Sequence, residues 1–409
     1  MRKIFSIAIL VLLFKGNAFA QALTLQSAVE TYVQNNLELQ IARSRLERST
    51  ADQIAARLRP NPSIAFTAEN LAVSGPTPFS RLYEVGATYS ETLELGGKRP
   101  QRQKAAEANI SAAEAQFEDT LRRGIAEVKR LYFEAMLARY GVEIAGENRQ
   151  TFDQLVQFNR TRFQEGAIPE VDLIKVRLER LKFDSTLGQA TLALRQATLR
   201  LLEKLGTSEM TSRPLSGEIT FSPVTTELRA LRELASSERT DVRAAVAEVN
   251  AARERLTLAR TLGKPDMNPF AGYKRVGNDN TLLFGVSMQL KVRDHNQADV
   301  ARAEADLKSA EFRLQLVKNH AVADVESIYA SMQTAADIVQ TFERELLQQA
   351  DETQSIAISA YEEGGTELLP VLEAQRTRAE VRQQYFKALF DYRASIIEME
   401  LATGRDIQP

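Results

Sequence analysis

The sequence predicts a mainly helical protein of long coiled-coil helices, with four β-strands per chain that form part of a membrane β-barrel. Three observations lead to this fold class: the composition, a long internal repeat, and two pairs of strands with alternating polarity. The 409 residues include 12 prolines and no tryptophan, and 26% of them are charged. A chain so poor in proline and so rich in Ala, Leu, Glu, Arg and Gln is expected to form long helices.

The N-terminus has the pattern of a secretory signal peptide. Two basic residues precede an apolar run over residues 4–14, and Ala18-Phe19-Ala20 is a cleavage signal before Gln21. We therefore expect residues 1–20 to be removed. A membrane-spanning helix needs about 20 apolar residues, and no later segment of that length is free of charge, so any membrane insertion must use strands. The sequence contains no cysteine, which excludes disulfides and a lipid-bearing cysteine.

A tandem duplication organises the mature chain. The segment Phe163–Leu173 matches Tyr361–Val371, and the glycines within them, Gly166 and Gly364, are 364 − 166 = 198 residues apart. Gly206 and Gly404 have the same separation. Farther upstream, Tyr132 and Tyr329 are 329 − 132 = 197 residues apart. We interpret residues 21–206 as the first repeat, 207–226 as a linker at the equator of the molecule, and 227–409 as the second repeat.

Each repeat is expected to contain a helix, a β-hairpin, a very long helix, a tight turn and a further helix. The hairpins are predicted at residues 63–93 and 270–291, and the turns at 164–170 and 362–368. Between His295 and Glu363 there is no glycine or proline. This run is long enough for one helix of roughly 100 Å, at about 1.5 Å per residue.

Apolar residues within that long run follow the spacing of a coiled-coil seam. They are Val300, Ala303, Leu307, Ala310, Leu314, Val317 and Ala321. Alanine at alternate positions indicates helices that approach closely. An ordinary antiparallel coiled coil would explain these seams equally well, so the strands decide between the two architectures.

The predicted strands alternate apolar and polar side chains, as strands do when one face meets lipid and the other meets water. The apolar members are Ile64, Phe66 and Ala68, then Tyr83, Val85, Ala87 and Tyr89, and in the second hairpin Leu282, Phe284, Val286 and Met288. A transmembrane barrel needs at least about eight strands, so four cannot close one. Three chains would supply twelve. A soluble pair of packed hairpins is the alternative that alternation alone leaves open.

The signal peptide, the duplication, the paired hairpins and the two matching turn segments together resemble the TolC family of outer-membrane efflux proteins. The resemblance covers essentially the whole mature chain. After the second predicted strand, the segment Glu91–Arg99, with the sequence ETLELGGKR, is similar to the branch of that family that exports heavy-metal cations of the cobalt, zinc and cadmium type.

The resemblance implies a homotrimer in the outer membrane of a Gram-negative bacterium. It implies a twelve-stranded β-barrel in the membrane and a helical tunnel, the α-barrel, with most of the mass in the periplasm. The chain is then a passive channel and not an enzyme, with no cofactor and no metal site. The implied partners are a periplasmic adaptor (membrane fusion protein), an inner-membrane pump of the resistance-nodulation-division type and outer-membrane lipid, but not nucleic acid.

In the family, a tyrosine and a basic residue near the second turn, followed by two acids, close the pore entrance. Tyr361 matches the tyrosine and Glu373 the inner acid. Thr366 replaces the basic residue and Pro370 the outer acid, so this closing network is incomplete here. Pro370 falls in the first turn of its helix, where the missing N–H is tolerated.

The first repeat has Asp172 and Lys175 at the two pore positions, so charge is redistributed between the repeats. We expect Glu373 and, to a lesser degree, Asp172 to line the entrance, and Lys175 either to pair with Glu373 as a lock or to leave it free as a cation filter. The resemblance also implies that the turns contact the adaptor. The residues concerned are Gly166, Ala167, Gly364, Gly365 and Thr366.

Other chemistry has little support in the sequence. The two histidines, His295 and His320, are too far apart in sequence to have the spacing of a metal site. Gly96-Gly97-Lys98-Arg99 lacks the spacing of a phosphate-binding loop and fits a strand-to-helix joint. A net charge of −2 gives no general attraction for nucleic acid. The alternative function is a periplasmic coiled-coil adaptor or structural scaffold, which the apolar strand faces disfavour.

Overall fold

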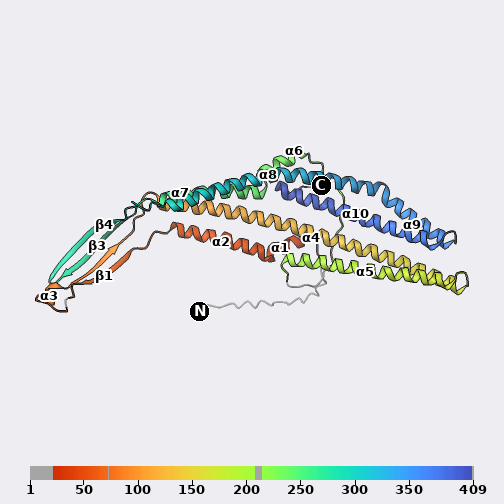
Figure 1. Ribbon diagram of the computed structural model, residues 1–409, viewed down its shortest axis with the longest axis horizontal. Helices are drawn as coiled ribbons and strands as arrows, with labels where there is room; N and C mark the ends of the chain where they lie inside the picture. Colours follow the sequence, from red (N-terminus) through yellow and green to blue (C-terminus); the bar gives the residue numbers. More distant parts are fainter. Residues whose placement is uncertain (1–21, 72, 208–213, 408–409) are drawn as a thin grey trace, which may run out of the picture. The chain divides into compact units, whose positions relative to one another are not determined.

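The computed structural model describes residues 22–71, 73–207 and 214–407 (Figure 1). The predicted signal peptide and part of the predicted linker lie outside these residues. The described chain is mainly helical and contains four strands, as the sequence predicts. These strands form one antiparallel sheet in the order β1-β2-β3-β4. None of the described helices is both long and apolar enough to cross a membrane.

The chain forms two compact units. The first contains the chain up to Asn35, together with Val128–Thr220 and Thr341–Phe390. The second contains Asn36–Glu127, Phe221–Gln340 and the chain from Asp391 onward. Both units are therefore built from both predicted repeats, because the longest helices run from one unit into the other.

The sheet belongs to the second unit. Its strands are β1 (Ser63–Glu69), β2 (Glu84–Ser90), β3 (Met267–Val276) and β4 (Asp279–Met288), and the short helix α3 (Phe79–Leu82) lies in the loop between β1 and β2. In the sheet register, Phe66 lies opposite Ala87, which lies opposite Tyr273. Tyr273 in turn lies opposite Leu282. Directly paired residues share a face, so the alternating apolar residues of all four strands gather on one side.

The two faces of the sheet differ in chemistry. The apolar face is solvent-exposed, with Phe66 81% and Phe284 74% accessible. On the opposite face, Lys274 forms ion pairs with Glu69 and Glu84. A sheet with one apolar and one charged face separates two environments of different polarity.

The second hairpin lies three residues earlier than the sequence interpretation placed it. We expected the hairpin over 270–291, but β3 begins at Met267 and Pro269 lies inside it. Proline is tolerated there because its missing N–H would face Glu91, which lies beyond the end of β2. The Pro269 carbonyl still accepts a hydrogen bond from the Glu91 N–H at 3.3 Å. The ladder then continues, since Leu93 and Met267 exchange both backbone hydrogen bonds.

The ETLELGGKR segment forms the joint between β2 and the long helix α4 (Lys98–Gln164). Gly96 and Gly97 have φ values of 72° and 81°, which non-glycine residues rarely adopt. The Lys98 ammonium group pairs with Asp266 at 2.7 Å, although the Lys98 side chain is almost fully buried. Gly96, Gly97 and Lys98 therefore have a structural role at this joint.

In each repeat, two consecutive helices precede the hairpin where one was expected. They are α1 (Leu25–Asn35) and α2 (Leu37–Arg57), and α6 (Leu228–Ser237) and α7 (Thr240–Leu262). Asn36 separates the first pair because its side chain accepts a hydrogen bond from the Leu39 N–H, as an N-cap residue does.

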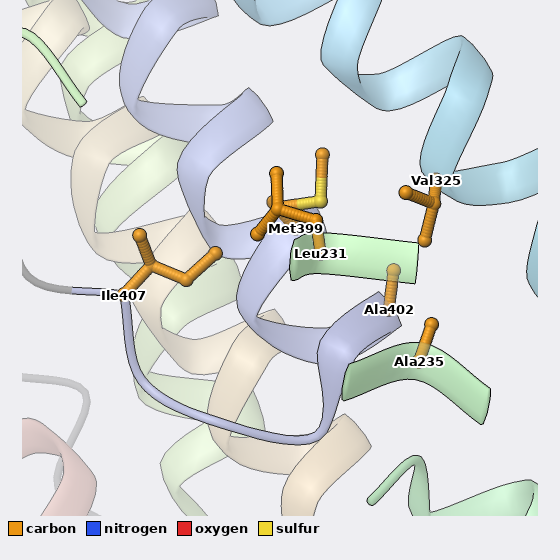
Figure 2. Close-up of a cluster of buried hydrophobic side chains, with 6 residues drawn as sticks. All are labelled: Leu231, Ala235, Val325, Met399, Ala402 and Ile407. Atoms are coloured by element: carbon orange, nitrogen blue, oxygen red, sulfur yellow. The ribbon is translucent and has the colours of Figure 1, made fainter. Parts of the chain in front are cut away.

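The core of the second unit includes a cluster of six buried side chains (Figure 2). They come from α6, from α8 (Gln297–Thr341), from α10 (Leu368–Thr403) and from the C-terminal segment, and are Leu231, Ala235, Val325, Met399, Ala402 and Ile407. The chain turns after α10 at Gly404, where φ is 74° and an added Cβ would lie 2.3 Å from the Glu238 carbonyl oxygen. Close packing of the C-terminal turn on α6 thus requires glycine.

Buried tyrosines hold the described part of the predicted linker. In the first unit, Leu23 pairs with Leu215, and the Tyr132 hydroxyl bonds to the Leu23 carbonyl at 3.0 Å. In the second unit, the Tyr392 hydroxyl donates to the Ser222 carbonyl at 2.8 Å and accepts from Val224 N–H at 3.0 Å. Burial raises the pKa of both tyrosines, which keeps the hydroxyls protonated donors.

The first unit contains two helical hairpins, which Figure 1 shows as α4 joined to α5 and α9 joined to α10. Their remaining elements are α5 (Glu170–Leu205), α9 (Leu347–Glu362) and α10 (Leu368–Thr403). The helix α8 (Gln297–Thr341) leads into α9 through one π-helical turn, η1 (Phe342–Leu346). A π turn accommodates one more residue than an α turn. It therefore accounts for the change of the repeat offset from 197 to 198 residues.

Candidate functional site

Each helical hairpin closes through a turn with the same backbone geometry. Gly166 and Gly364 adopt φ values of 75° and 80°, and their N–H groups bond to the carbonyls of Phe163 and Tyr361 at 3.0 and 3.1 Å. No atom lies within 4 Å of an added Cβ at either glycine. The left-handed conformation, and not lack of space, therefore favours glycine at both turns.

The next residues of the turns also correspond. The N–H groups of Ala167 and Gly365 bond to Arg162 and Ala360 carbonyls, both at 2.8 Å, which completes a C-cap of the Schellman type. Ala167 is exposed and Thr366 is partly exposed. All five turn residues proposed from the sequence are therefore at or near the surface of the first unit.

An ion pair at equivalent positions ties the two helices of each hairpin together. The Arg180 guanidinium donates to the Asp153 carboxylate at 2.8 Å, and Arg378 donates to Asp351 at 2.5 Å. Arg378 lies 378 − 180 = 198 residues after Arg180, and Asp351 lies 351 − 153 = 198 residues after Asp153. The repeat found in the sequence is thus present at the level of side-chain contacts below the turns.

Tyr361 lies in the core of the first unit. Its ring packs in a cluster with Phe152 and Val371, and its hydroxyl donates to the side-chain oxygen of Asn159 at 2.7 Å. Asn159 is fully buried and donates in turn to the Leu155 carbonyl at 2.9 Å. This buried hydrogen bond joins the first hairpin to the second. Asn159 was missed in the sequence, where its signal is a polar residue on the apolar helix face of Phe152 and Leu155.

A cavity of about 490 Å³ lies between the two hairpins next to Tyr361. It brings together four of the residues singled out from the sequence, Asp172, Lys175, Tyr361 and Thr366. The full lining consists of Asn159, Arg162, Ile168, Asp172, Lys175, Glu179, Tyr361, Thr366, Glu367, Leu368, Leu369 and Leu372. The cavity is therefore mixed in charge, with apolar walls contributed by α10.

Glu373 is not among the residues that line this cavity. It lies on an exposed face of α10. Lys175 donates to Asp172 at 3.0 Å, an i,i+3 pair on one helix in which both side chains are substantially exposed. Within one chain, Lys175 is therefore engaged by Asp172 and not by Glu373, and an exposed pair of this kind contributes little to stability.

A second set of hydrogen-bonded polar side chains lies between the two hairpins, and the sequence analysis did not identify it. Gln375 is 1% exposed, donates to the Asn148 side chain at 2.6 Å and accepts from the Gln354 side chain at 2.8 Å. Nearby, Glu147 on α4 accepts hydrogen bonds from Arg378 and Arg382 on α10. Buried amides of this kind fix the register of packed helices because a shift would leave them unpaired.

Comparison with known proteins finds a family whose sequences match this chain. The family described as "Outer membrane efflux protein" matches residues 28–207 and 231–405. The chain belongs to this family. The resemblance to TolC-type efflux proteins is thereby confirmed, and the outer membrane efflux protein is a transport channel and not an enzyme.

Two relatives of this outer membrane efflux protein come from Cupriavidus metallidurans. The cobalt-zinc-cadmium resistance protein CzcC is 27% identical over 378 residues, which cover 90% of this chain and 87% of CzcC. The nickel and cobalt resistance protein CnrC is 27% identical over 289 residues, 70% of this chain and 68% of CnrC. Crystal structures of CusC share the fold, with a TM-score of 0.75, 19% identity and coverage of 93% of this chain and 92% of CusC.

Proposed function

We propose that this chain is the outer-membrane channel of a tripartite efflux system, which passes substrates passively from the periplasm to the exterior. The observation that carries the proposal is the four-stranded sheet, with its exposed apolar face and charged reverse face. Such a sheet suits lipid on one side and a water-filled lumen on the other. Membership of the outer membrane efflux protein family supports the same function.

The sheet also supports a homotrimer. β1 and β4 are its edge strands, and an exposed edge needs a partner within a membrane. In the proposed trimer, β4 of each chain pairs with β1 of the next, which closes a twelve-stranded barrel. The helices of the three chains then form the periplasmic α-barrel, where most of the mass lies. The division into repeats at 21–206 and 227–409, joined by the linker, is part of this proposal.

Heavy-metal cations are the proposed substrates. This rests on CzcC and CnrC, whose names describe resistance to cobalt, zinc, cadmium and nickel. The proposed partners are a periplasmic adaptor at the turns that contain Gly166 and Gly364, and an inner-membrane pump of the resistance-nodulation-division type. Glu373 and Asp172 are proposed to face the pore entrance, where a ring of carboxylates favours cations.

The alternative, a periplasmic adaptor or scaffold, is disfavoured by the same sheet. A soluble protein rarely exposes an apolar face that extends over four strands, because such a face promotes association. The side chains of Phe66 and Phe284 on that face are highly exposed to solvent.

The proposal is tested by producing the full chain in a Gram-negative host, separating the two membranes and sizing the protein in mild detergent. A trimer in the outer-membrane fraction is expected. A monomer in the soluble periplasmic fraction would contradict the proposal. Photo-crosslinking residues at positions 167 and 366 should then capture the adaptor, whereas capture of outer-surface components alone would show that the orientation is inverted.

A further inference from the structure

The two helical hairpins of the first unit contact each other through a small set of side chains. The internal repeat places a corresponding set of side chains at a second location on the same unit, where they do not contact each other. Within the chain, the Phe158 ring of the first hairpin lies 6.3 Å from the Tyr361 ring of the second, measured between centroids. The Tyr361 hydroxyl also bonds to Asn159, beside Phe158. The first hairpin thus contributes Phe158 and Asn159, and the second contributes Tyr361.

The offset of 198 residues defines the counterpart of this contact. Phe158 corresponds to Ile356, Asn159 to Ala357 and Tyr361 to Phe163. All of these positions lie beyond the π turn or its equivalent, where the turn hydrogen bonds and the Arg180–Asp153 and Arg378–Asp351 pairs keep this offset. In one chain, Ile356 and Phe163 lie at the surface of their hairpins, whereas Ala357 is partly buried and packs against the cluster that contains Tyr361. Ile356 is 70% exposed and Phe163 is 38% exposed.

The counterparts of Tyr361 and Asn159, which are Phe163 and Ala357, both lack the polar group of the hydrogen bond. Where the contact within the chain has a tyrosine hydroxyl and an asparagine amide, the counterpart has phenylalanine and alanine, so both members of the hydrogen bond are absent. Removing only one member would leave a buried polar group without a partner, which is costly, whereas replacing both is nearly neutral. Paired replacement at positions on different hairpins is expected if the two positions face each other across a second contact.

We infer that Ile356 and Ala357 of one chain pack around Phe163 of a second copy of this chain, as Phe158 and Asn159 pack around Tyr361 within the chain. The inference rests on the proposed homotrimer. The occupant is a second copy because only the first hairpin of another chain can present Phe163 to the second hairpin in the same relative orientation. A ring of hairpins then alternates two kinds of contact, one hydrogen-bonded within each chain and one wholly apolar between chains.

Exposed residues on α5 are consistent with such a neighbour. Four of them alternate in steps of three and four residues, which is the spacing of a coiled-coil seam. They are Val171, Ile174, Leu178 and Leu181, all of which are more than 40% exposed in one chain, with Ile174 the lowest at 45%. The first hairpin therefore has further apolar side chains for a neighbouring helix to cover.

Cysteine crosslinking tests the inference directly, because the natural sequence contains no cysteine. The variant with Phe163→Cys and Ile356→Cys, treated in outer membranes with a short bismaleimide, should convert most of the chain to covalent dimers and trimers on denaturing gels. Each single variant should remain monomeric. The control variant, Asp153→Cys with Arg180→Cys, should crosslink within one chain and migrate as a monomer.

Two outcomes separate this inference from the function on which it rests. A trimer in mild detergent that gives no covalent multimer with the 163/356 pair overturns the contact and leaves the trimeric channel intact. A monomer in mild detergent overturns both. Both substituted residues are exposed in the single chain, so these variants are expected to fold.

Reproducing the Tyr361–Asn159 hydrogen bond at the proposed contact between chains provides an independent test. Ala357→Asn alone should lower the temperature at which the trimer dissociates in detergent, because the new amide lacks a partner at the apolar contact. Adding Phe163→Tyr should recover most of that shift, since it rebuilds between chains the bond that Tyr361 and Asn159 make within one chain. A double variant that dissociates at the same temperature as the single variant would overturn the inference.

Discussion

The hydroxyl of Tyr361 donates a hydrogen bond to the buried side chain of Asn159, 2.7 Å away and 202 residues earlier in the chain. Tyr361→Phe should destabilise the protein by about 1–3 kcal/mol, because the buried Asn159 carbonyl loses its donor. The double variant Tyr361→Phe with Asn159→Leu should lose less than the two single variants combined. Thermal unfolding of the detergent-solubilised protein measures both, and full additivity would show that the two side chains are not coupled.

Membrane insertion should depend on the apolar face of the sheet. Phe284→Arg and Val286→Arg should reduce the yield in the outer membrane, since arginine on a lipid-facing strand position costs about 2–4 kcal/mol near the membrane centre. Ser287→Arg is the matched control, because Ser287 follows Val286 directly in β4 and its side chain lies on the opposite face of the sheet. Equal yields for all three variants would show that this face does not meet lipid.

Glu373 should govern ion preference if it faces the pore. Because Lys175 is held by Asp172, the Glu373 carboxylate is available to attract cations, and Glu373→Gln should lower cation selectivity in planar-bilayer recordings. Glu380→Gln serves as the control, since Glu380 lies on the same helix and pairs with Arg376 at 2.9 Å. Unchanged selectivity and conductance in the Glu373 variant would leave Glu373 as a charge on the helix surface.

The turn glycines should respond to substitution through backbone strain alone. Gly364→Ala places a side chain at φ 80° without a clash, so a loss of about 1–2 kcal/mol is expected from the left-handed conformation. Gly188→Ala, within the helix α5 and also without a clash, should instead stabilise by about 0.5–1 kcal/mol. Opposite signs in thermal unfolding would support this assignment, and a Gly364 variant as stable as the natural protein would contradict it.

Stability should fall at high pH through Tyr385 on α10. Burial, together with the hydrogen bond to Glu343 at 3.0 Å, raises the pKa of Tyr385 from 10.0 to about 12. The folded state therefore holds the phenolic proton more tightly than the unfolded state, and the associated stability is complete below pH 10 and lost as pH rises toward 12. Tyr385→Phe should flatten this part of the unfolding profile, and an unaltered pH dependence would exclude Tyr385 as its source.

The sequence was sufficient for the strands because their alternation of polarity is local and their register is fixed by the apolar face. It was less reliable where a local rule was overridden by tertiary structure. The second hairpin was expected to begin at residue 270, yet the backbone hydrogen bonds of Glu91 and Leu93 extend β3 back through Pro269 to Met267. The π turn at Phe342–Leu346 leaves no mark in composition, and only the change in repeat offset reveals it.

The candidate site was recovered in part. Tyr361 and the turn glycines were found because the duplication displays them twice, whereas Asn159 and Gln375 were missed because their partners lie in the other hairpin, far away in sequence. The two alternatives for Lys175, paired with Glu373 or leaving it free, did not include the i,i+3 partner Asp172 that Lys175 contacts within one chain. Local helix geometry was the better guide in that instance.

The π turn between α8 and α9 also bears on the history of the chain. One extra residue in an uninterrupted α-helix would rotate everything beyond it by about 100° around the helix axis. The π turn takes up that residue, so the side chains beyond it keep the contacts of their first-half counterparts, as the Arg180–Asp153 and Arg378–Asp351 pairs do. The corresponding helix of the first half, α4, is α-helical throughout. Insertion of a single codon in the second half, or loss of one from the first half, after the gene duplication would account for this difference. Deleting one codon within Phe342–Leu346 is thus the smallest change expected to restore an uninterrupted α-helix and a repeat offset of 197 residues on both sides of it.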